Sequence, residues 1–380
     1  VNRLIGDCLV SAGAISYYGP FTGDFREEII TNWVEKCKEL EVPVSEDFTL
    51  EDTMGDQMKI RDWHVQGLPS DSVSINNAIL VSEGLKFPLM IDPQTQGSRW
   101  IKNMETKFQT VKLNEKDLGK KLENWSKLGM PVILEDIGET LPSSIDDILL
   151  RNVTLDKDFR FYMTTKLANP HYLPEIFIRV TLINFTVTHQ GLEEQLLADV
   201  VKCERPEIEE KKIKLIVDMA ADQKKLKALE DAILKNLVES SASVLDDEAL
   251  VSNLRESKER SIVIKKKMEQ SKKTGEEVDE ARAKYQCVAE RGSILYFVIA
   301  DFALVDPMYQ FSLAYFTRLF DNILETSEQN EDVDQRISIL LQSVTETVFI
   351  NICRGLFNAH RTIFSFLVAA KILLKKGDIS

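Results

Sequence analysis

The 380-residue chain is 44% hydrophobic and 28% charged, with a formal net charge of −14 and a pI near 5.0. This composition is typical of a globular protein of about two or three domains, and so negative a surface repels phosphates and excludes nucleic-acid reading as the main function. Five widely spaced cysteines without a CxxC pair predict reduced thiols in a cytosolic protein, and the lack of about 18 consecutive apolar residues predicts no membrane partner.

The first segment, residues 1–76, is predicted to hold helices and a loop that lead into the main domain. Apolar residues at helical spacing indicate one helix before Gly19-Pro20 and a second one through Leu40, capped by Thr22 or Asp24. The chain begins with Val1 and has no signal-like segment, so we expect it to be part of something longer. The second helix is expected to bury Phe25, Ile29, Ile30, Trp33 and Cys37.

The second segment, residues 77–190, alternates short apolar runs with helical patterns. Continuous apolar strands separated by helices predict a parallel sheet that is covered on both faces, which makes this segment an α/β core. The expected helices lie near 97–106, 115–128 and 143–151. The expected strands are 78–81, 89–91, 108–111, 132–134, 159–163 and 180–187.

The third segment, residues 191–291, is rich in Lys and Glu and nearly free of aromatic residues. Its narrow apolar stripes predict two helices, about 50 Å long or more, that form an antiparallel coiled-coil hairpin. Ser240–Ser243 suits the tip, and Asp246 or Asp247 can cap the return helix. The alternative is two helices that lie across a globular domain. The seam of the hairpin is expected to contain Leu215, Leu226, Ile233, Leu250, Ile264 and Met268.

The last segment, residues 292–380, is helical and far more apolar. Leu295, Phe302, Phe316 and Phe320 are among the side chains that are expected to form a compact core. We therefore predict a small helical domain at the root of the hairpin.

Residues 88–101, PLMIDPQTQGSRWI, have the strand–turn–helix layout of a phosphate-binding loop but not its residues. Such a loop reads Gly, four residues, Gly, Lys, then Ser or Thr, because the lysine reaches the phosphates and the hydroxyl holds Mg²⁺. Here Asp92 adds negative charge, Pro93 removes an N–H, and Gly97 is followed by Ser98 and Arg99. The loop is predicted to be degenerate, with Trp100 and Ile101 anchoring the helix that follows.

Two further strands are predicted to end in polar residues at the same edge of the sheet, where ligands of open α/β sheets bind. Glu135 and Asp136 follow a buried strand and occupy the place of the Walker B acids, in reversed order. Thr164, Thr165 and Asn169 follow the next strand, in the place of sensor residues. Loop, acidic strand end and polar strand end, in this order, are the anatomy of an AAA+ ATPase module.

Several long strings of the sequence resemble dynein heavy chains, and the resemblance extends over the whole chain. It is carried by GDCLVSAGAISYYGPFTGDFR at 6–26, FPLMIDPQTQGSRWIKNME at 87–105, DFRFYMTTKLANPHYLPEI at 158–176, GLEEQLLADVVKCERPEIEEKK at 191–212 and GSILYFVIADFALVDPMYQFSLAYF at 292–316. The resemblance implies the fifth of six AAA+ modules of the motor ring, with a hairpin that acts as the strut, or buttress, of the microtubule-binding stalk. It is closer to axonemal than to cytoplasmic heavy chains.

One departure from this family lies between Asp136 and Asp158. Dyneins usually carry a longer segment there, with a small hairpin, whereas here residues 148–154 run almost directly into the next strand. Either the chain lacks this hairpin or residues are missing from the sequence.

Residues and resemblance together predict a structural, non-hydrolysing module, which relays ATP-driven ring movement through its strut to the stalk. We expect no cofactor and no catalytic residue in this module, and ATP or ADP with Mg²⁺ in other modules of the parent chain. No metal site is expected because the four histidines are isolated.

The resemblance also implies partners and a location. The partners are neighbouring AAA+ modules, which Arg179 is a candidate to contact, the stalk coiled coil, dynein intermediate and light chains and, indirectly, the microtubule. The location is the cytoskeleton of the cytoplasm, in the axoneme of a cilium or flagellum. Two alternatives stay open: an independent ATPase with a coiled-coil insertion, similar to chromosome-maintenance proteins, and a coiled-coil tether or adaptor.

Overall fold

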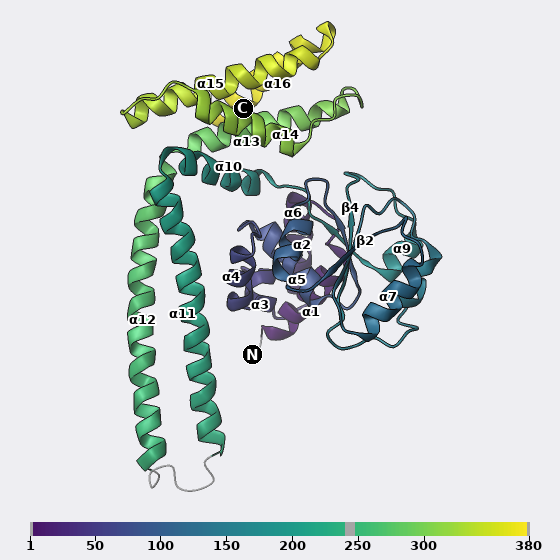
Figure 1. The fold of residues 1–380 in the computed structure, drawn as a ribbon, viewed down its shortest axis with the longest axis vertical. Coiled ribbons are helices and arrows are strands. Elements are labelled where there is room, and N and C mark those ends of the chain that lie inside the picture. Colours follow the sequence, from purple (N-terminus) through teal and green to yellow (C-terminus); the bar gives the residue numbers. More distant parts are fainter. Residues whose placement is uncertain (1–2, 240–247, 378–380) are drawn as a thin grey trace. The chain divides into compact units, whose positions relative to one another are not determined.

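The computed structural model of the protein describes residues 3–239 and 248–377 (Figure 1). Within these ranges the side chains of residues 233, 236–239, 248–254 and 256–257 are outside the description. The contacts divide the chain into two compact units, residues 1–192 and 193–380, and each is described by itself. The finer division into four segments stays a prediction. None of the helices in the described ranges is long and apolar enough to cross a membrane.

The first unit begins with five helices: α1 (Leu4–Tyr17), α2 (Gly23–Glu39), α3 (Leu50–Met54), α4 (Gln57–Val65) and α5 (Ser72–Glu83). The two long helices before residue 41 confirm the prediction for this region. Cys37 is buried in α2 as expected, but the expectation for Phe25 is wrong, since this side chain is 50% exposed.

Residues 78–81 form part of helix α5 and not a strand, so the prediction for this run is wrong. Asp71 precedes the helix, and its carboxylate accepts hydrogen bonds from the N–H and hydroxyl of Ser74, which fixes the helix start at this point. Ala78, Ile79 and Leu80 are fully buried. A helix that is buried all round gives the same continuous apolar run as a buried strand, and periodicity alone does not separate the two.

The centre of this unit is a five-stranded parallel sheet with the order β2-β3-β4-β1-β5. The strands are β1 (Pro88–Ile91), β2 (Gln109–Lys112), β3 (Val132–Glu135), β4 (Phe161–Thr165) and β5 (Thr181–Asn184). All five match predicted apolar runs. The intervening helices are α6 (Gln96–Met104), α7 (Leu118–Lys127), η1 (Ser143–Ile145), α8 (Asp146–Leu149) and α9 (Pro174–Arg179).

Helices cover both faces of this sheet, as predicted. Figure 1 shows α2, α5 and α6 on one side of the strands and α7 and α9 on the other. Because successive strand residues point to opposite faces, Met90 belongs to a core with α5 and α6, whereas Leu89 and Ile91 belong to a second core with α7. The parallel strands bring Asp92, Asp136 and Lys166, the residues that follow β1, β3 and β4, to one edge of the sheet.

The second unit is helical. It contains all but the first turn of α10 (His189–Glu204), and it contains α11 (Pro206–Glu239), α12 (Glu248–Ala283), α13 (Gln286–Asp301), η2 (Phe302–Leu304), α14 (Leu313–Thr326), α15 (Val333–Gly355) and α16 (Asn358–Lys376). Helix α13 is the centre of a bundle, because it packs against α14, α15 and α16. The predicted core is confirmed by the burial of Leu295, Phe302, Phe316 and Phe320.

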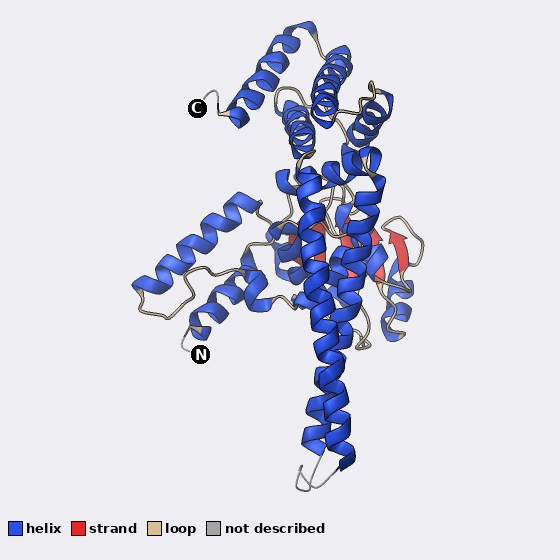
Figure 2. Ribbon diagram, turned by 90° about the vertical axis from the view of Figure 1, so that its left-hand side faces the viewer, coloured by secondary structure: helices blue, strands red, loops and turns tan. Residues whose placement is uncertain are grey.

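Helices α11 and α12 are the longest in the chain, with 34 and 36 residues, and lie side by side in Figures 1 and 2. They are antiparallel, since ion pairs join Lys212 to Asp279 and Asp222 to Lys267. At about 1.5 Å per residue each is roughly 50 Å long. Of the predicted seam, Leu215, Leu226, Ile264 and Met268 are half-buried, whereas the side chains of Ile233 and Leu250 lie outside the description, as do the predicted tip and the caps Asp246 and Asp247.

Candidate functional site

The loop after β1 wraps around the side chain of its own first residue. Asp92 is 1% exposed, and its backbone N–H donates to the carbonyl of Thr165 (2.9 Å), which ties the loop to β4. Thr95 then adopts a left-handed backbone (φ 60°) just before α6 begins. This turn directs the first backbone N–H groups of α6 back toward the Asp92 carboxylate.

The carboxylate of Asp92 occupies the N-terminus of α6. Its Oδ1 accepts from the N–H of Gln96 at 2.7 Å, and its Oδ2 accepts from the N–H of Ser98 at 2.8 Å. Backbone N–H groups at a helix N-terminus are the donors with which a phosphate-binding loop holds phosphate. In this chain they are already bonded to an anion that is covalently part of the protein.

Burial and these hydrogen bonds act on Asp92 in opposite directions. Removal from water raises the pKa of its carboxyl above the usual value, and the N–H donors together with the charge of Arg99 lower it by a smaller amount. Desolvation is therefore the larger effect, and burial disfavours the ionised form of Asp92.

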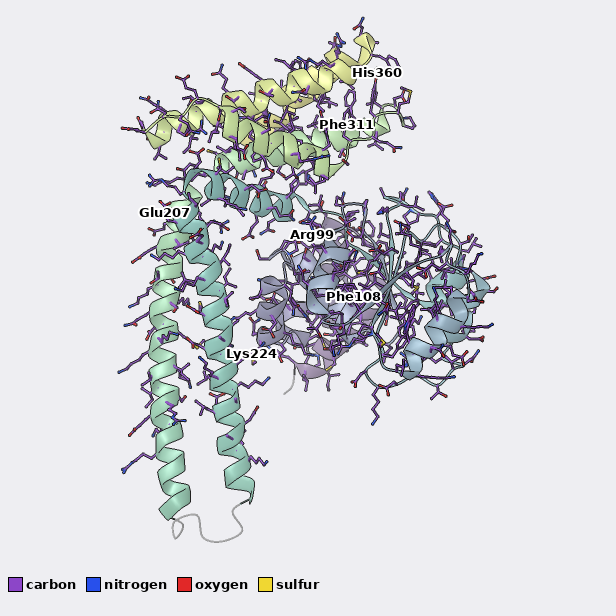
Figure 3. The ribbon with its side chains drawn as sticks, in the orientation of Figure 1. Arg99, Phe108, Glu207, Lys224, Phe311 and His360 are labelled. Carbon is purple, nitrogen blue, oxygen red and sulfur yellow. The ribbon has the colours of Figure 1, made fainter. Side chains whose placement is uncertain are left out.

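The other loop residues contribute one positive charge, that of Arg99, which lines the cavity at this edge of the sheet. Ser98 is buried and its hydroxyl donates to Glu135 Oε1 at 3.3 Å, while Arg99 is exposed and is labelled in Figure 3. A Cβ on Gly97 would come within 3.1 Å of the ring of Phe185, the residue after β5, so a larger residue at this position would require the ring to shift by a few tenths of an ångström. Trp100 and Ile101 are fully buried, as expected, and anchor this helix in the core.

The two acids at the end of β3, Glu135 in the strand and Asp136 after it, both pair with lysines. Glu135 Oε1 accepts from Lys102 Nζ at 2.6 Å. Asp136, which has a left-handed backbone (φ 58°), contacts Lys166 Nζ at 2.8 Å and Lys112 Nζ at 3.3 Å. The hydrogen bond from Lys166, aided by Lys112, lowers the pKa of the Asp136 carboxyl. Neither lysine of Asp136 was singled out from the sequence, but both follow from strand order, since β2 and β4 flank β3.

The polar residues predicted at the carboxyl end of β4 divide into two groups, since Thr164 and Thr165 are the last residues of the strand and Asn169 lies beyond it. Thr164 and Thr165 are buried, and the Thr165 hydroxyl donates to the carbonyl of Ile137 at 2.6 Å, so it holds the loop after β3 in place. Asn169 is exposed and does not line the cavity at this edge. Arg179 pairs with Asp146 (2.7 Å) within the same unit, and a contact of Arg179 with a second module stays a prediction.

One cavity of about 450 Å³ collects most of these residues. Three acids and three basic residues line it, and each of the acids is bonded to a donor from this chain. Among these lining residues, Lys102 and Lys166 are therefore paired with acids and do not offer a free ammonium to a γ-phosphate. The acids Glu135 and Asp136 do not form an open pair for Mg²⁺. Within residues 3–239 and 248–377 no cluster of three or more potential ligands could hold a metal ion. The lining residues are Asp92, Thr95, Ser98, Arg99, Lys102, Asn103, Glu135, Asp136, Thr164 and Lys166.

Comparison with known proteins gives a consistent family. The chain matches the family described as ATP-binding dynein motor region over residues 61–264. It is 43% identical to human dynein axonemal heavy chain 6 over 398 residues, which cover 100% of this chain and 10% of that protein. It is 39% identical to mouse dynein axonemal heavy chain 3 over 396 residues, and 41% identical to mouse dynein axonemal heavy chain 2 over 399 residues. These cover 100% of this chain and 10% and 9% of the relatives, so the chain spans about a tenth of their length.

Proposed function

This chain belongs to the dynein motor region family, and from the geometry of its strand edge we propose that it is a structural, non-hydrolysing AAA+ module of a dynein-like microtubule motor. The observation that carries the proposal is the Asp92 carboxylate on the N–H groups of Gln96 and Ser98. A nucleotide phosphate would have to displace this anion and would then lie beside a buried negative charge. We infer that the module binds no nucleotide, and that ATP or ADP with Mg²⁺ act in other modules of the parent chain.

The long helix pair supplies a mechanical part for this function. We infer that α11 and α12 form a coiled-coil strut, because Leu215, Leu226, Ile264 and Met268 make a narrow half-buried seam and cross-helix ion pairs keep the register. Two supercoiled helices are stiffer than one. A strut on a packed helical base relays movement of the ring to the microtubule-binding stalk.

The helical unit also exposes several large apolar side chains. We propose that neighbouring AAA+ modules of the same chain are the partners that these side chains meet. An axonemal location agrees with the names of the relatives. The exposed apolar side chains are Leu304, Val305, Met308, Phe357, Ile363 and Phe366.

The alternatives are less well supported. An independent ATPase with a coiled-coil insertion needs a phosphate loop that can accept phosphate, and here that loop is filled by Asp92. A simple tether has no use for a buried five-stranded parallel sheet. Dynein intermediate and light chains and an indirect link to the microtubule remain proposed partners of the parent complex.

Calorimetric titration of the chain with Mg-ATP tests the absence of a nucleotide site. We expect no saturable heat below about 1 mM ligand, and a micromolar dissociation constant would contradict the proposal. The triple variant Asp92→Gly, Ser98→Lys, Arg99→Thr is the matched comparison, because it removes the internal anion and rebuilds the Gly-x4-Gly-Lys-Thr pattern. This variant is expected to gain measurable binding.

A further inference from the structure

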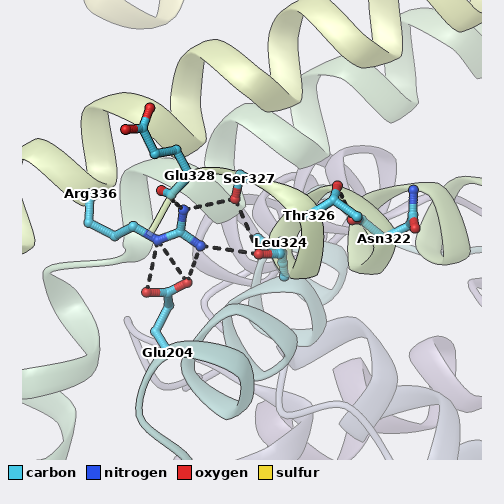
Figure 4. A network of polar contacts seen from close by, with 7 residues as sticks. All are labelled: Glu204, Asn322, Leu324, Thr326, Ser327, Glu328 and Arg336. Atoms are coloured by element: carbon cyan, nitrogen blue, oxygen red, sulfur yellow. Dashed lines mark hydrogen bonds and ion pairs between the residues drawn. The ribbon is translucent and has the colours of Figure 1, made fainter. Parts of the chain in front are cut away.

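A buried arginine of α15 holds the point at which the helix pair begins. Arg336 is 1% exposed, and its partner Glu204 is the last residue of α10, two positions before Pro206 opens α11. Figure 4 shows the guanidinium between the Glu204 carboxylate and the C-terminal end of α14. The two charged residues are 132 positions apart in the sequence. The Arg336 side chain of the bundle therefore reaches the base of α11, the first helix of the pair.

All five N–H groups of this guanidinium are used. Nε lies 3.1 Å from both carboxylate oxygens of Glu204, and Nη2 donates to Glu204 Oε1 at 2.7 Å and to the carbonyl of Leu324 at 3.1 Å. Nη1 donates to the Ser327 hydroxyl at 2.8 Å and to the carbonyl of Glu328 at 2.6 Å. A planar fork with every donor bonded accepts one orientation only, so it fixes α10 against α14 and the loop before α15.

Helix α12, the second helix of the pair, is held less tightly at its base. Arg282, near the end of α12, lies 3.3 Å from the carboxylate of Glu209 in the first turn of α11, and both side chains are nearly buried. Arg282 Nε and Glu209 Oε2 form no hydrogen bond with each other, so this contact is an ion pair without hydrogen-bond geometry. Lys212 adds contacts to Asp279 at 3.2 Å and Glu194 at 3.7 Å. Among these contacts of the described residues, it is the Arg336–Glu204 pair that is fixed by directed hydrogen bonds.

We propose that Arg336 is the positioning residue that sets the direction of the helix pair on its base and transmits movement of the bundle into α11. This inference rests on the proposed relay function. A buried ion pair is a weak source of stability, because desolvation offsets much of the attraction, and an apolar pair of similar volume often replaces it without loss. What an apolar pair cannot supply is the fixed orientation.

This difference gives a test that separates stability from orientation. Arg336→Met alone leaves Glu204 buried without its partner and is expected to destabilise the helical unit. The double variant Arg336→Met, Glu204→Met removes both charges and is expected to restore the thermal stability to near that of the unmodified chain. Arg354→Met, on the exposed end of the same helix, is the matched control.

Two readouts on the double variant decide the matter. The first is amide hydrogen exchange of residues 205–212 in the chain, which we expect to become at least about tenfold faster while the core of α13 stays protected. The second is the ratio of the microtubule dissociation constant with ATP to that without ATP, measured in the heavy chain motor that carries the double variant. We expect this ratio to fall by about tenfold, while ATPase activity without microtubules is retained.

The outcomes distinguish this inference from the proposed function. Unchanged exchange at residues 205–212 in a folded double variant would overturn the role of Arg336, whatever the motor does. Faster exchange together with an unchanged ATP-dependent ratio would leave Arg336 as the anchor and overturn the relay through the helix pair, and hence the proposed function. Faster exchange with a reduced ratio supports both.

Discussion

Replacing Asp92 by asparagine keeps the shape of the side chain but removes one of its two acceptors. The amide oxygen can accept from only one of the N–H groups of Gln96 and Ser98, and the amide NH₂ then faces the other. One charge-assisted hydrogen bond is lost, at about 1.5–3 kcal/mol, and one buried N–H is left unpaired, at about 1–3 kcal/mol. The variant also no longer has the desolvation cost of a buried charge, which offsets part of this loss. We therefore expect the free energy of unfolding to fall by about 2–4 kcal/mol.

Thermal unfolding of the chain measures this loss. For a unit of this size about 1 kcal/mol corresponds to roughly 2–4 °C, so the midpoint of the first unit is expected to fall by about 5–15 °C. Asp117→Asn is the control, because Asp117 directly precedes α7 with a left-handed backbone, as Thr95 precedes α6, and its side chain makes no capping hydrogen bond. A control that is as destabilised as Asp92→Asn would refute the specific role of the Asp92 carboxylate.

The pH dependence of the stability of the unmodified chain and of Asp92→Asn provides a second test of the Asp92 carboxylate. The folded-state pKa of Asp92 is raised, so the folded protein holds this proton more tightly than the unfolded chain does. The pH-dependent part of the carboxyl's contribution to stability is therefore fully present below its ordinary pKa and is lost as the pH rises through the folded value. The stability gap between the unmodified chain and Asp92→Asn should widen as the pH falls from neutral through the raised pKa of Asp92 toward the ordinary carboxyl pKa. A gap that narrows would contradict the account.

Two further predictions concern the helical unit. Burial and the nearby Asp321 raise the pKa of Asp199 to about 6. Asp199→Asn should therefore stabilise the unit by about 1–2 kcal/mol at pH 8, and this gain should shrink as the pH falls through 6. Urea unfolding at several pH values measures the gain, and a gain that does not depend on pH would contradict this cause. Phe320 of α14 is fully buried against α13, so Phe320→Ala should cost about 3–5 kcal/mol in the same assay. A loss below about 1 kcal/mol would mean that the core of the bundle lies elsewhere.

The strands of the sheet were predictable because a parallel sheet with both faces covered needs continuous apolar runs, and five of the six expected runs are strands. The sixth, 78–81, failed for the same reason, since a helix in the middle of the core is equally apolar. Its capping residue Asp71 was visible in the sequence and marks the helix start. The long helices were predictable from their seam and their length.

The chemistry of the strand edge was predictable only in part. The residues that a phosphate loop lacks can be read directly, but the position of Asp92 on the N–H groups of α6 depends on the left-handed turn at Thr95. The lysines on Asp136 come from neighbouring strands, so strand order has to be known first. The Arg336–Glu204 bond joins residues 132 positions apart, and no local pattern marks it.

Shortening of the helix pair in the heavy chain motor tests the central claim most directly. Replacing residues 216–274 by a four-residue glycine turn removes paired parts of both arms and keeps the contacts of Lys212 with Asp279 and of Arg282 with Glu209 at the base. The account predicts that ATP hydrolysis without microtubules continues while ATP no longer weakens microtubule binding. Normal ATP-dependent release from microtubules by the shortened motor would contradict it.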